Sequence, residues 1–167
     1  FNFLMQIGIV SDTHNNLKNI DKIISLFNEE RVSTVIHTGD IASARSLEKF
    51  SELKCKLVGV YGNNDRNEIG LKEVAEINNF LFREPPNLLT LDDRNLAIFH
   101  EPDLIDDFLM QNENIDVVVH GHTHRYRKEI INGVLFFNPG ECAGMKEGRN
   151  AIGILNLKSL ETKRIFF

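Results

Sequence analysis

The sequence contains no tryptophan and two cysteines in 167 residues. The two, Cys55 and Cys142, cannot form the disulfide framework of a small secreted protein. Neither belongs to a Cys-x-x-Cys motif. We therefore expect both to be buried as small apolar side chains in a protein of the reducing cytoplasm.

Long apolar runs are also missing. No stretch approaches the roughly 20 residues that a membrane-spanning helix needs, so we expect no membrane partner. No charged, apolar and small-residue series typical of a secretory signal is visible near the start. Met5 is a candidate natural start, and residues 1–4 would then lie upstream of it.

Acidic residues outnumber basic ones, with 24 Asp+Glu against 19 Lys+Arg, and the formal net charge is -5. Proteins that bind long nucleic acids usually carry a basic field, so this balance argues against a long nucleic acid as partner. A local basic pocket for a small anion stays open. The length and the 42% hydrophobic content fit one compact domain over residues 1–167.

Apolar periodicity predicts alternating strands and helices in the first half of the chain. The predicted strands are 5–10, 32–38 and 56–60, and the predicted helices are 17–30, 42–53 and 69–77. Strands then dominate, at 80–82, 88–91, 96–99, 115–119, 127–131, 134–137, 150–157 and 160–166, with a helix from Pro102 to 112. Asn132-Gly133 predicts a type I′ hairpin. This order indicates βαβ units with a parallel sheet, and an antiparallel C-terminal portion.

Five polar clusters follow directly after apolar strands, at residues 11–14, 38–40, 61–65, 100–101 and 120–124. Strands of an open α/β sheet end at a common edge, where ligands bind, so we expect the clusters to converge. Glycines at Gly39, Gly62 and Gly121 allow tight turns and close approach of the backbone there.

The residues expected to converge form a set of metal ligands: Asp12, His14, Asp40, Asn63, His100, His122 and His124. Imidazole, carboxylate and amide donors suit borderline divalent ions such as Mn, Fe, Co, Ni or Zn. A Mg or Ca site would not need four histidines. Seven donors exceed one tetrahedral ion and suit two ions that share a carboxylate. A single Asp or His after a strand is more often a turn former, so the hypothesis depends on the whole set.

The motifs that carry this set also resemble a known family. Asp12-Thr13-His14, Gly39-Asp40, Gly62-Asn63-Asn64-Asp65, His100 and Gly121-His122-Thr123-His124 resemble those of the calcineurin-like metallophosphoesterases. Segments 11–14, 61–65 and 138–142 are most similar to its small single-domain branch, with archaeal and bacterial YfcE-like phosphodiesterases and Vps29-like proteins. The resemblance covers nearly the whole chain. It implies an α/β (α+β) fold, a four-layer αββα sandwich of two mixed β-sheets flanked by helices.

Carried over residue by residue, the resemblance implies two divalent metal ions, with Mn, Ni, Fe or Zn expected. Asp12, His14 and His124 would hold the first ion, Asn63, His100 and His122 the second, and Asp40 would bridge them. A hydroxide between the ions would attack a small phosphodiester, which makes a dinuclear metal-dependent phosphoric diester hydrolase. Asp40, Asn63, Asn64 and Asp65 are the residues expected to serve catalysis.

The chain departs from the family pattern at two positions. Many relatives have Gly-Asn-His, and the chain has Asn64 in place of that His, which cannot act as a general acid at neutral pH. Glu101 replaces a common Gly. Arg66 and Arg125 are candidates to bind a phosphate oxygen, with a solvated surface position as the equal alternative. His37 and His120 are expected to pack near the site without ligating metal.

A noncatalytic Vps29-like interaction scaffold is the alternative function. Vps29-like proteins typically lose one of the histidines, whereas the chain keeps all four, which favours the enzyme. Exposed strand edges in the C-terminal half would permit a homodimer.

Overall fold

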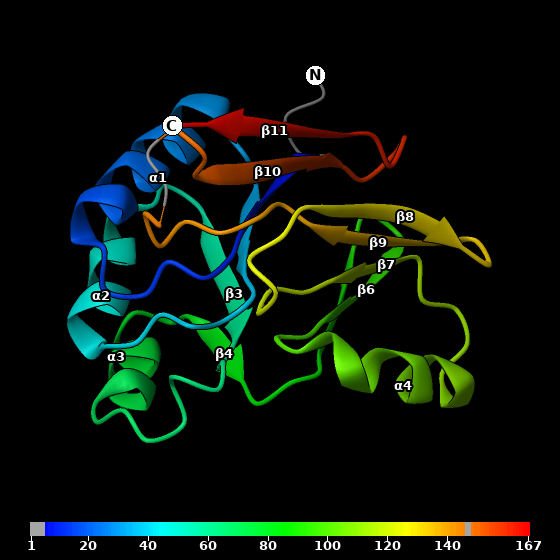
Figure 1. Ribbon diagram of the computed structural model, residues 1–167, viewed down its shortest axis with the longest axis horizontal. Helices are drawn as coiled ribbons and strands as arrows, with labels where there is room; N and C mark the ends of the chain where they lie inside the picture. Colours follow the sequence, from blue (N-terminus) through cyan, green and yellow to red (C-terminus); the bar gives the residue numbers. More distant parts are fainter. Residues whose placement is uncertain (1–5, 146–147) are drawn as a thin grey trace.

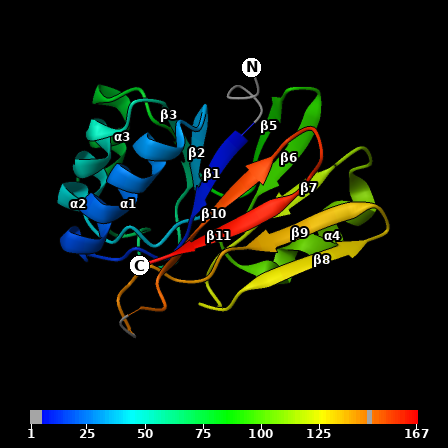
Figure 2. The ribbon, with the colours of Figure 1, turned by 90° about the horizontal axis from the view of Figure 1, so that it is seen from above.

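The computed structural model describes residues 6–145 and 148–167, which form two β-sheets packed face to face between helices (Figure 1). The candidate start at Met5 and the residues before it lie outside the described part of the chain. Seen from above, α1 to α3 cover one outer face and α4 lies against the opposite one (Figure 2).

The first sheet has the strand order β11-β10-β1-β2-β3-β4. Its parallel strands are β1 (Gln6–Val10), β2 (Thr34–His37), β3 (Lys56–Val60) and β4 (Leu81–Arg83). The crossovers are α1 (Leu17–Glu30), α2 (Ala44–Lys49) with a 3-10 turn at Phe50–Glu52, and α3 (Leu71–Ile77). The antiparallel strands β10 (Ala151–Asn156) and β11 (Thr162–Phe166) complete the sheet beside β1.

The second sheet has the order β5-β6-β7-β9-β8. Its central strands β6 (Arg94–Ile98), β7 (Val117–Val119) and β9 (Val134–Asn138) are parallel. The edges β5 (Asn87–Leu91) and β8 (Arg127–Ile131) pair antiparallel with β6 and β9. A 3-10 turn (Pro102–Leu104) and α4 (Ile105–Gln111) connect β6 to β7.

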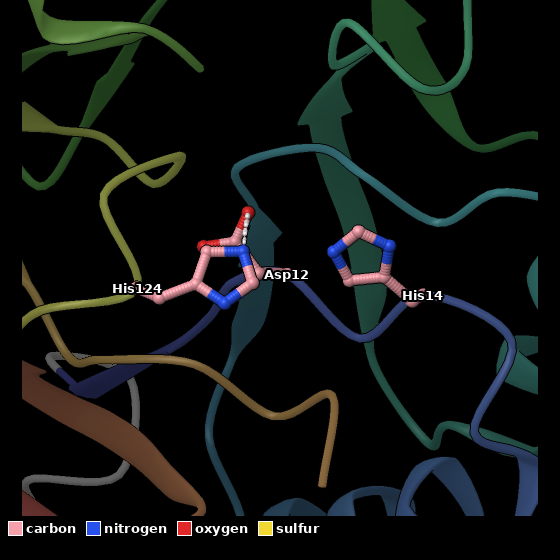
Figure 3. A group of neighbouring side chains, drawn as sticks. All are labelled: Asp12, His14 and His124. Atoms are coloured by element: carbon pink, nitrogen blue, oxygen red, sulfur yellow. Dashed lines mark ion pairs between the residues drawn. The ribbon is translucent and has the colours of Figure 1, made fainter. Parts of the chain in front are cut away.

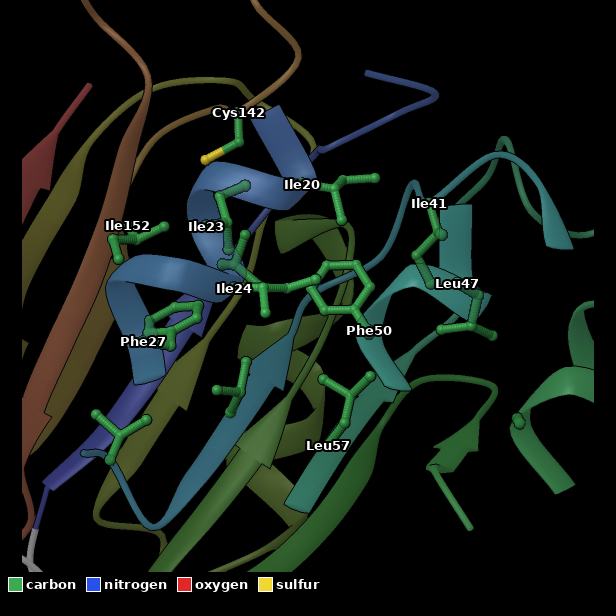
Figure 4. Packing of buried hydrophobic residues seen from close by; sticks show 14 of the residues in the cluster. Ile20, Ile23, Ile24, Phe27, Ile41, Leu47, Phe50, Leu57, Cys142 and Ile152 are labelled. Carbon is green, nitrogen blue, oxygen red and sulfur yellow. The ribbon is translucent and has the colours of Figure 1, made fainter. Parts of the chain in front are cut away.

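Three buried apolar layers hold these elements together, because side chains of a strand alternate between its two faces. Val10 of β1 packs with α1 residues such as Ile23 and Phe27 in the cluster between the helices and the first sheet (Figure 4). Ile7 and Ile9 of the same strand belong to the cluster between the two sheets. A smaller cluster lies under α4. The predicted four-layer αββα sandwich is confirmed.

Most predicted elements are present, with shifted ends. The helix 17–30 and the strands 56–60 and 127–131 have the predicted bounds. The helix predicted from 42 begins at Ala44, because Ser43 caps it by accepting the Ser46 N–H. The helix predicted from 69 begins at Leu71, after Gly70 with a φ of 90°. Asn132 and Gly133 both have positive φ, as a type I′ turn requires.

The two cysteines are free. Cys142 is buried as predicted, whereas Cys55 is half-buried, and burial raises the pKa of its thiol to about 11. Within residues 6–145 and 148–167, no helix combines the length and the apolar character needed to cross a bilayer.

Candidate metal centre

The five polar clusters converge at the carboxyl ends of β1, β2, β3, β6 and β7, as predicted. Each cluster begins one or a few residues after its strand ends. The two sheets bring these ends together from opposite sides, so the site lies at the joint edge of the sandwich. The side chains that meet there are Asp12, His14, Asp40, Asn63, His100, His122 and His124.

One group of possible metal ligands consists of Asp12, His14 and His124, whose donor atoms lie within 4.8 Å of one another (Figure 3). His124 Nε2 is 3.9 Å from Asp12 Oδ1. The Asp12 carboxylate is fully buried, whereas the two imidazoles are about one third exposed. Ser11 Oγ donates to Asp12 Oδ2 at 2.6 Å and fixes the carboxylate. The group is therefore anchored on one side and open to solvent on the other.

A second group contains Asp12, Asp40 and His100, also with donor atoms within 4.8 Å. Asn63 Oδ1 is 2.8 Å from His100 Nε2 and 3.2 Å from His122 Nδ1. Asp40 Oδ2 is 3.4 Å from His100 Nε2 and 3.8 Å from His14 Nε2. Asp40 therefore contacts a histidine of each group.

The hydrogen-bond partners of two histidines indicate where a cation fits. His100 Nδ1 lies 2.8 Å from the Thr38 carbonyl, which only accepts, so Nδ1 carries the proton. Its Nε2 faces the Asn63 and Asp40 oxygens, a contact that a proton on Nε2 or a bound cation makes favourable. His14 Nε2 is buried and has no hydrogen-bond partner within the described residues. Both observations fit a divalent metal ion.

Electrostatics at Asp40 and His100 point the same way. Burial by itself would raise the pKa of Asp40, but the neighbouring His100 ring and the Asn64 N–H groups hold it well below its ordinary value. Burial would lower the pKa of His100, and the Asp40 carboxylate with the Thr38 carbonyl raises it above its ordinary value. Asp40 is thus an anion that attracts positive charge to this point.

The backbone around the site is strained. Five of the converging residues have left-handed φ angles between 47° and 69°: Asp12, His14, Asp40, His122 and His124. Such a conformation costs of order 1 kcal/mol or more per residue outside glycine. Strain of this kind accumulates where function constrains side-chain direction. Two glycines make the crowding feasible, because a Cβ would lie 2.2 Å from Asp40 Oδ1 at Gly62 and 2.2 Å from Ser11 Oγ at Gly121.

Asp65 acts on the backbone of the Asp40 loop. Its Oδ2 accepts the N–H groups of Asp40 and Gly62, and its Oδ1 accepts those of Ile41 and Ala42, at 2.7 to 2.9 Å. Burial raises the pKa of this carboxyl, while the four N–H groups favour its charged form. We found no contact of Asp65 with a histidine of the site among the described residues.

Asn64 contacts Asp40 directly. Its backbone N–H donates to Asp40 Oδ1 at 3.0 Å, and its Nδ2 donates to Asp40 Oδ2 at 2.9 Å. The side chain is exposed at the rim of the site. Asn64 thus orients the carboxylate that contacts both groups.

His37 and His120 are fully packed, as predicted. His37 Nδ1 accepts the Gly39 N–H at 3.0 Å, so its Nε2 carries the proton and donates to Thr13 Oγ1 at 3.0 Å. The ring therefore ties the loop after β1 to the loop after β2. Burial lowers the pKa of His37 to about 3.

Several contacts at the rim of the site, and several that hold its ligand residues in place, could not be predicted from the sequence. Arg66 and Glu101 form an exposed ion pair at 3.3 Å across the loops after β3 and β6. Arg125 is exposed. Ser11 and the Thr38 carbonyl support Asp12 and His100. Ser11 and Thr38 stand next to motif residues in the sequence, and that position was a signal for both. No sequence pattern, however, identifies the backbone carbonyl of Thr38 as the partner of His100.

Comparison with known proteins gives consistent matches. The profile of the calcineurin-like phosphoesterase superfamily domain matches residues 5–160. The chain is 39% identical over 163 residues to Phosphodiesterase MJ0936 of Methanocaldococcus jannaschii, covering 96% of this chain and 98% of that protein. It is 25% identical to Phosphodiesterase YfcE of Escherichia coli, covering 89% and 85% of the two chains.

Solved structures agree in fold. The structure of an archaeal phosphodiesterase superposes with a TM-score of 0.88 at 38% identity, over 98% of this chain and 100% of the other. A Vps29 structure from Entamoeba histolytica superposes with a TM-score of 0.69 at 18% identity, over 98% and 99% of the two chains.

Proposed function

The chain belongs to the calcineurin-like phosphoesterase superfamily, and on this premise we propose that it is a phosphodiesterase that hydrolyses small phosphodiesters at a centre of two divalent metal ions. The observation that carries the proposal is the convergence of four imidazoles, two carboxylates and an amide from five strand ends. The buried Nε2 of His14, which has no hydrogen-bond partner among the described residues, adds a donor atom that a metal ion would complete.

The proposal gives each group of ligands one ion. Asp12, His14 and His124 hold the first, and Asn63, His100 and His122 hold the second. Asp40 would serve both ions, since its Oδ2 lies 3.8 Å from His14 Nε2 and 3.4 Å from His100 Nε2. Mn, Ni, Fe or Zn suit these mixed nitrogen and oxygen donors.

Ions of this kind supply hydroxide at neutral pH and polarise the phosphoryl oxygens. The residues of the chain position the reaction. Asn64 and Asp65 act through Asp40, the first by hydrogen bonds to its carboxylate and the second by fixing its loop. Asn64 cannot donate a proton to the leaving oxygen at neutral pH, so the site favours diesters with good leaving groups.

A noncatalytic scaffold is the second candidate function. The likeness to Vps29 at 18% identity concerns the fold alone. The four histidines and the strained backbone around them form the kind of metal-ligand set that a metal-dependent hydrolase requires. These features favour the enzyme.

We infer that residues 1–167 act as one domain and that the two unpaired cysteines suit the cytoplasm. The acidic net charge of -5 favours a small diester over a long nucleic acid. A homodimer would use an exposed strand edge such as β8.

The test is the hydrolysis of bis(p-nitrophenyl) phosphate and of p-nitrophenyl phosphate by metal-stripped protein that receives Mn, Ni, Zn or Mg in turn. We expect turnover of the diester that depends on the metal, with His124→Ala and Asp40→Asn inactive. Correctly folded protein without turnover in any metal would instead support the scaffold.

A further inference from the structure

A pocket of about 420 Å³ begins at His124 and continues away from the metal ligands toward the end of β11. Figure 2 shows the carboxyl end of β11 beside the loop that follows β9. Arg164 and Phe166 on β11, Tyr126 before β8 and Arg149 before β10 line it. The pocket therefore offers room for one ester group of a diester whose phosphorus lies at the metal centre.

Arg164 is held in one orientation within the pocket. Its guanidinium carbon lies 4.0 Å from the ring centre of Tyr126 and 4.5 Å from that of Phe166. Its Nε donates to the Pro139 carbonyl at 2.9 Å. Stacking on aromatic rings and a hydrogen bond at Nε preorganise a guanidinium for recognition. The two rings cover the faces of the Arg164 guanidinium, so the hydrogen-bond donors left for a ligand are the N–H groups of Nη1 and Nη2.

These donors are free for a ligand. Within residues 6–145 and 148–167, neither Nη atom of Arg164 has a hydrogen-bond partner, and Arg149 has no hydrogen bond or ion pair. A Cβ at Gly140 would lie 3.2 Å from Arg164 Nη2, so the glycine leaves that atom uncovered. Glu141 also lines the pocket, but it is 8% exposed and its Oε2 accepts the Ala143 N–H.

Among the described lining residues, two guanidinium groups against one engaged carboxylate give the pocket a positive balance in a chain of net charge -5. Fork-shaped N–H donors match the oxygens of a phosphate group. We infer that this pocket binds a second phosphate group, carried by the alcohol that stays on the phosphodiester, so that the preferred substrates are diesters of phosphorylated alcohols. The inference rests on the proposed function, and it names the substrate class of that same site.

Two matched substrates test the inference, thymidine 5′-(p-nitrophenyl phosphate) and its 3′-phosphorylated derivative. In both, water adds to phosphorus and the bond to p-nitrophenolate breaks, so they differ in the extra phosphate and not in the leaving group. We expect kcat/KM about tenfold higher for the 3′-phosphorylated substrate, mostly through a lower KM. The advantage should shrink as NaCl is raised, because salt screens exposed charges.

Variants identify the pocket as the cause. Arg164→Gln and Arg149→Gln should each reduce the ratio of the two kcat/KM values toward one, mainly by raising KM for the 3′-phosphorylated substrate. Arg149 is exposed on a loop, so its variant remains informative if Arg164→Gln disturbs folding. Arg45→Gln, an exposed arginine of α2, is the matched control and should keep the wild-type ratio.

The outcomes separate the inference from the proposed function. Equal kcat/KM values for the two substrates, or a ratio that both arginine variants leave unchanged, would overturn the inference and leave the phosphodiesterase intact. Absence of turnover for both substrates would overturn the proposed function. In that case calorimetry on metal-loaded protein tests the pocket. Thymidine 3′,5′-bisphosphate should bind about tenfold more tightly than thymidine 5′-monophosphate. Equal affinities of the two compounds would refute the inference.

Discussion

At the scale of single residues, the carboxylate of Asp65 stabilises the loop that presents Asp40. Both of its oxygens accept two backbone N–H groups each, and the side chain is 3% exposed. Asparagine in its place would turn an amide NH2 toward two N–H donors. Asp65→Asn should therefore lower the free energy of unfolding by about 3 kcal/mol.

Urea denaturation of chelator-treated protein measures this change. Asp92→Asn, in the exposed turn between β5 and β6, is the matched control and should stay within about 0.5 kcal/mol of wild type. If the Asp65 variant were as stable as the control, the four hydrogen bonds would not be what holds the loop.

His37 gives the metal-free protein a pH dependence. Its pKa is lowered to about 3 in the folded chain by burial and returns to 6.5 on unfolding. The unfolded state then binds a proton below pH 6.5 that the folded state does not, so stability is full above that pH and falls on acidification toward about 3. Between pH 6.5 and 5.5, this one group should remove about 1 kcal/mol from the free energy of unfolding.

Urea titrations at several pH values, in the presence of chelator, check that slope. His37→Gln carries no titratable group, so its stability should fall less steeply with acidification, whatever its stability at pH 7. Parallel pH profiles for the two proteins would contradict the assignment.

The exposed ion pair with Glu101 occupies the guanidinium of Arg66 at the rim of the site. The pair is exposed and should contribute less than about 1 kcal/mol to stability. Glu101→Gly removes a negative charge near the site and frees Arg66 for an anionic substrate. We expect KM for bis(p-nitrophenyl) phosphate to fall about twofold to threefold with an unchanged melting temperature.

Glu113→Gly, in the loop before β7, changes the net charge equally and is the control for that effect. An unchanged or higher KM in the Glu101 variant alone would show that Arg66 does not contact substrate.

The chemical types at the site could be predicted from the sequence, because Asp, His and Asn follow apolar strands in five places. The backbone conformation of these residues could not be predicted from the sequence. The left-handed φ angles of Asp12 and His122 depend on the crowding of loops from two sheets. The partners of Asp65 are backbone amides, which no side-chain pattern identifies. The ion pair of Arg66 and Glu101 joins loops whose proximity arises only in the folded chain.

At the scale of elements, α1 packs on β1 through a glycine. A Cβ at Gly8 would lie 2.4 Å from Cε1 of Phe27, a side chain that is 1% exposed. Gly8→Ala should therefore cost about 1–3 kcal/mol by overpacking. In a Phe27→Leu background the same substitution should cost less, since the smaller side chain leaves room.

A double-mutant cycle of unfolding free energies measures this coupling. Equal costs of Gly8→Ala in the two backgrounds would mean that the Phe27 ring moves aside freely.

Elements with strong periodicity and clear ends were predicted well. The helix 17–30 shows apolar residues at helical spacing and begins after Asn16, whose side chain accepts the Asn19 N–H. The ends of helices and strands that lie next to the metal site were harder to predict. Ala42 has a φ of 75°, because Asp65 holds the preceding loop, and this delays α2 to Ala44.

At the scale of the whole molecule, the metal site is a consequence of two sheets that face each other. β10 pairs with β1, so the chain returns to the first sheet after its middle part has contributed the strands of the second sheet. Periodicity predicts such strands but not their pairing, because the partners are distant in sequence. The convergence of strand ends within each sheet was predictable, since parallel strands end at a common edge, whereas the approach of the two edges depends on how the sheets pack.

We propose that these strand ends build a phosphodiesterase with two metal ions per chain. The most direct measurement is a titration of metal-stripped protein with Mn²⁺, followed by hydrolysis of bis(p-nitrophenyl) phosphate at a protein concentration well above the metal dissociation constants. We expect the rate to rise to a plateau at about two equivalents of metal per chain. A plateau at one equivalent, or a rate that does not respond to metal, would contradict it.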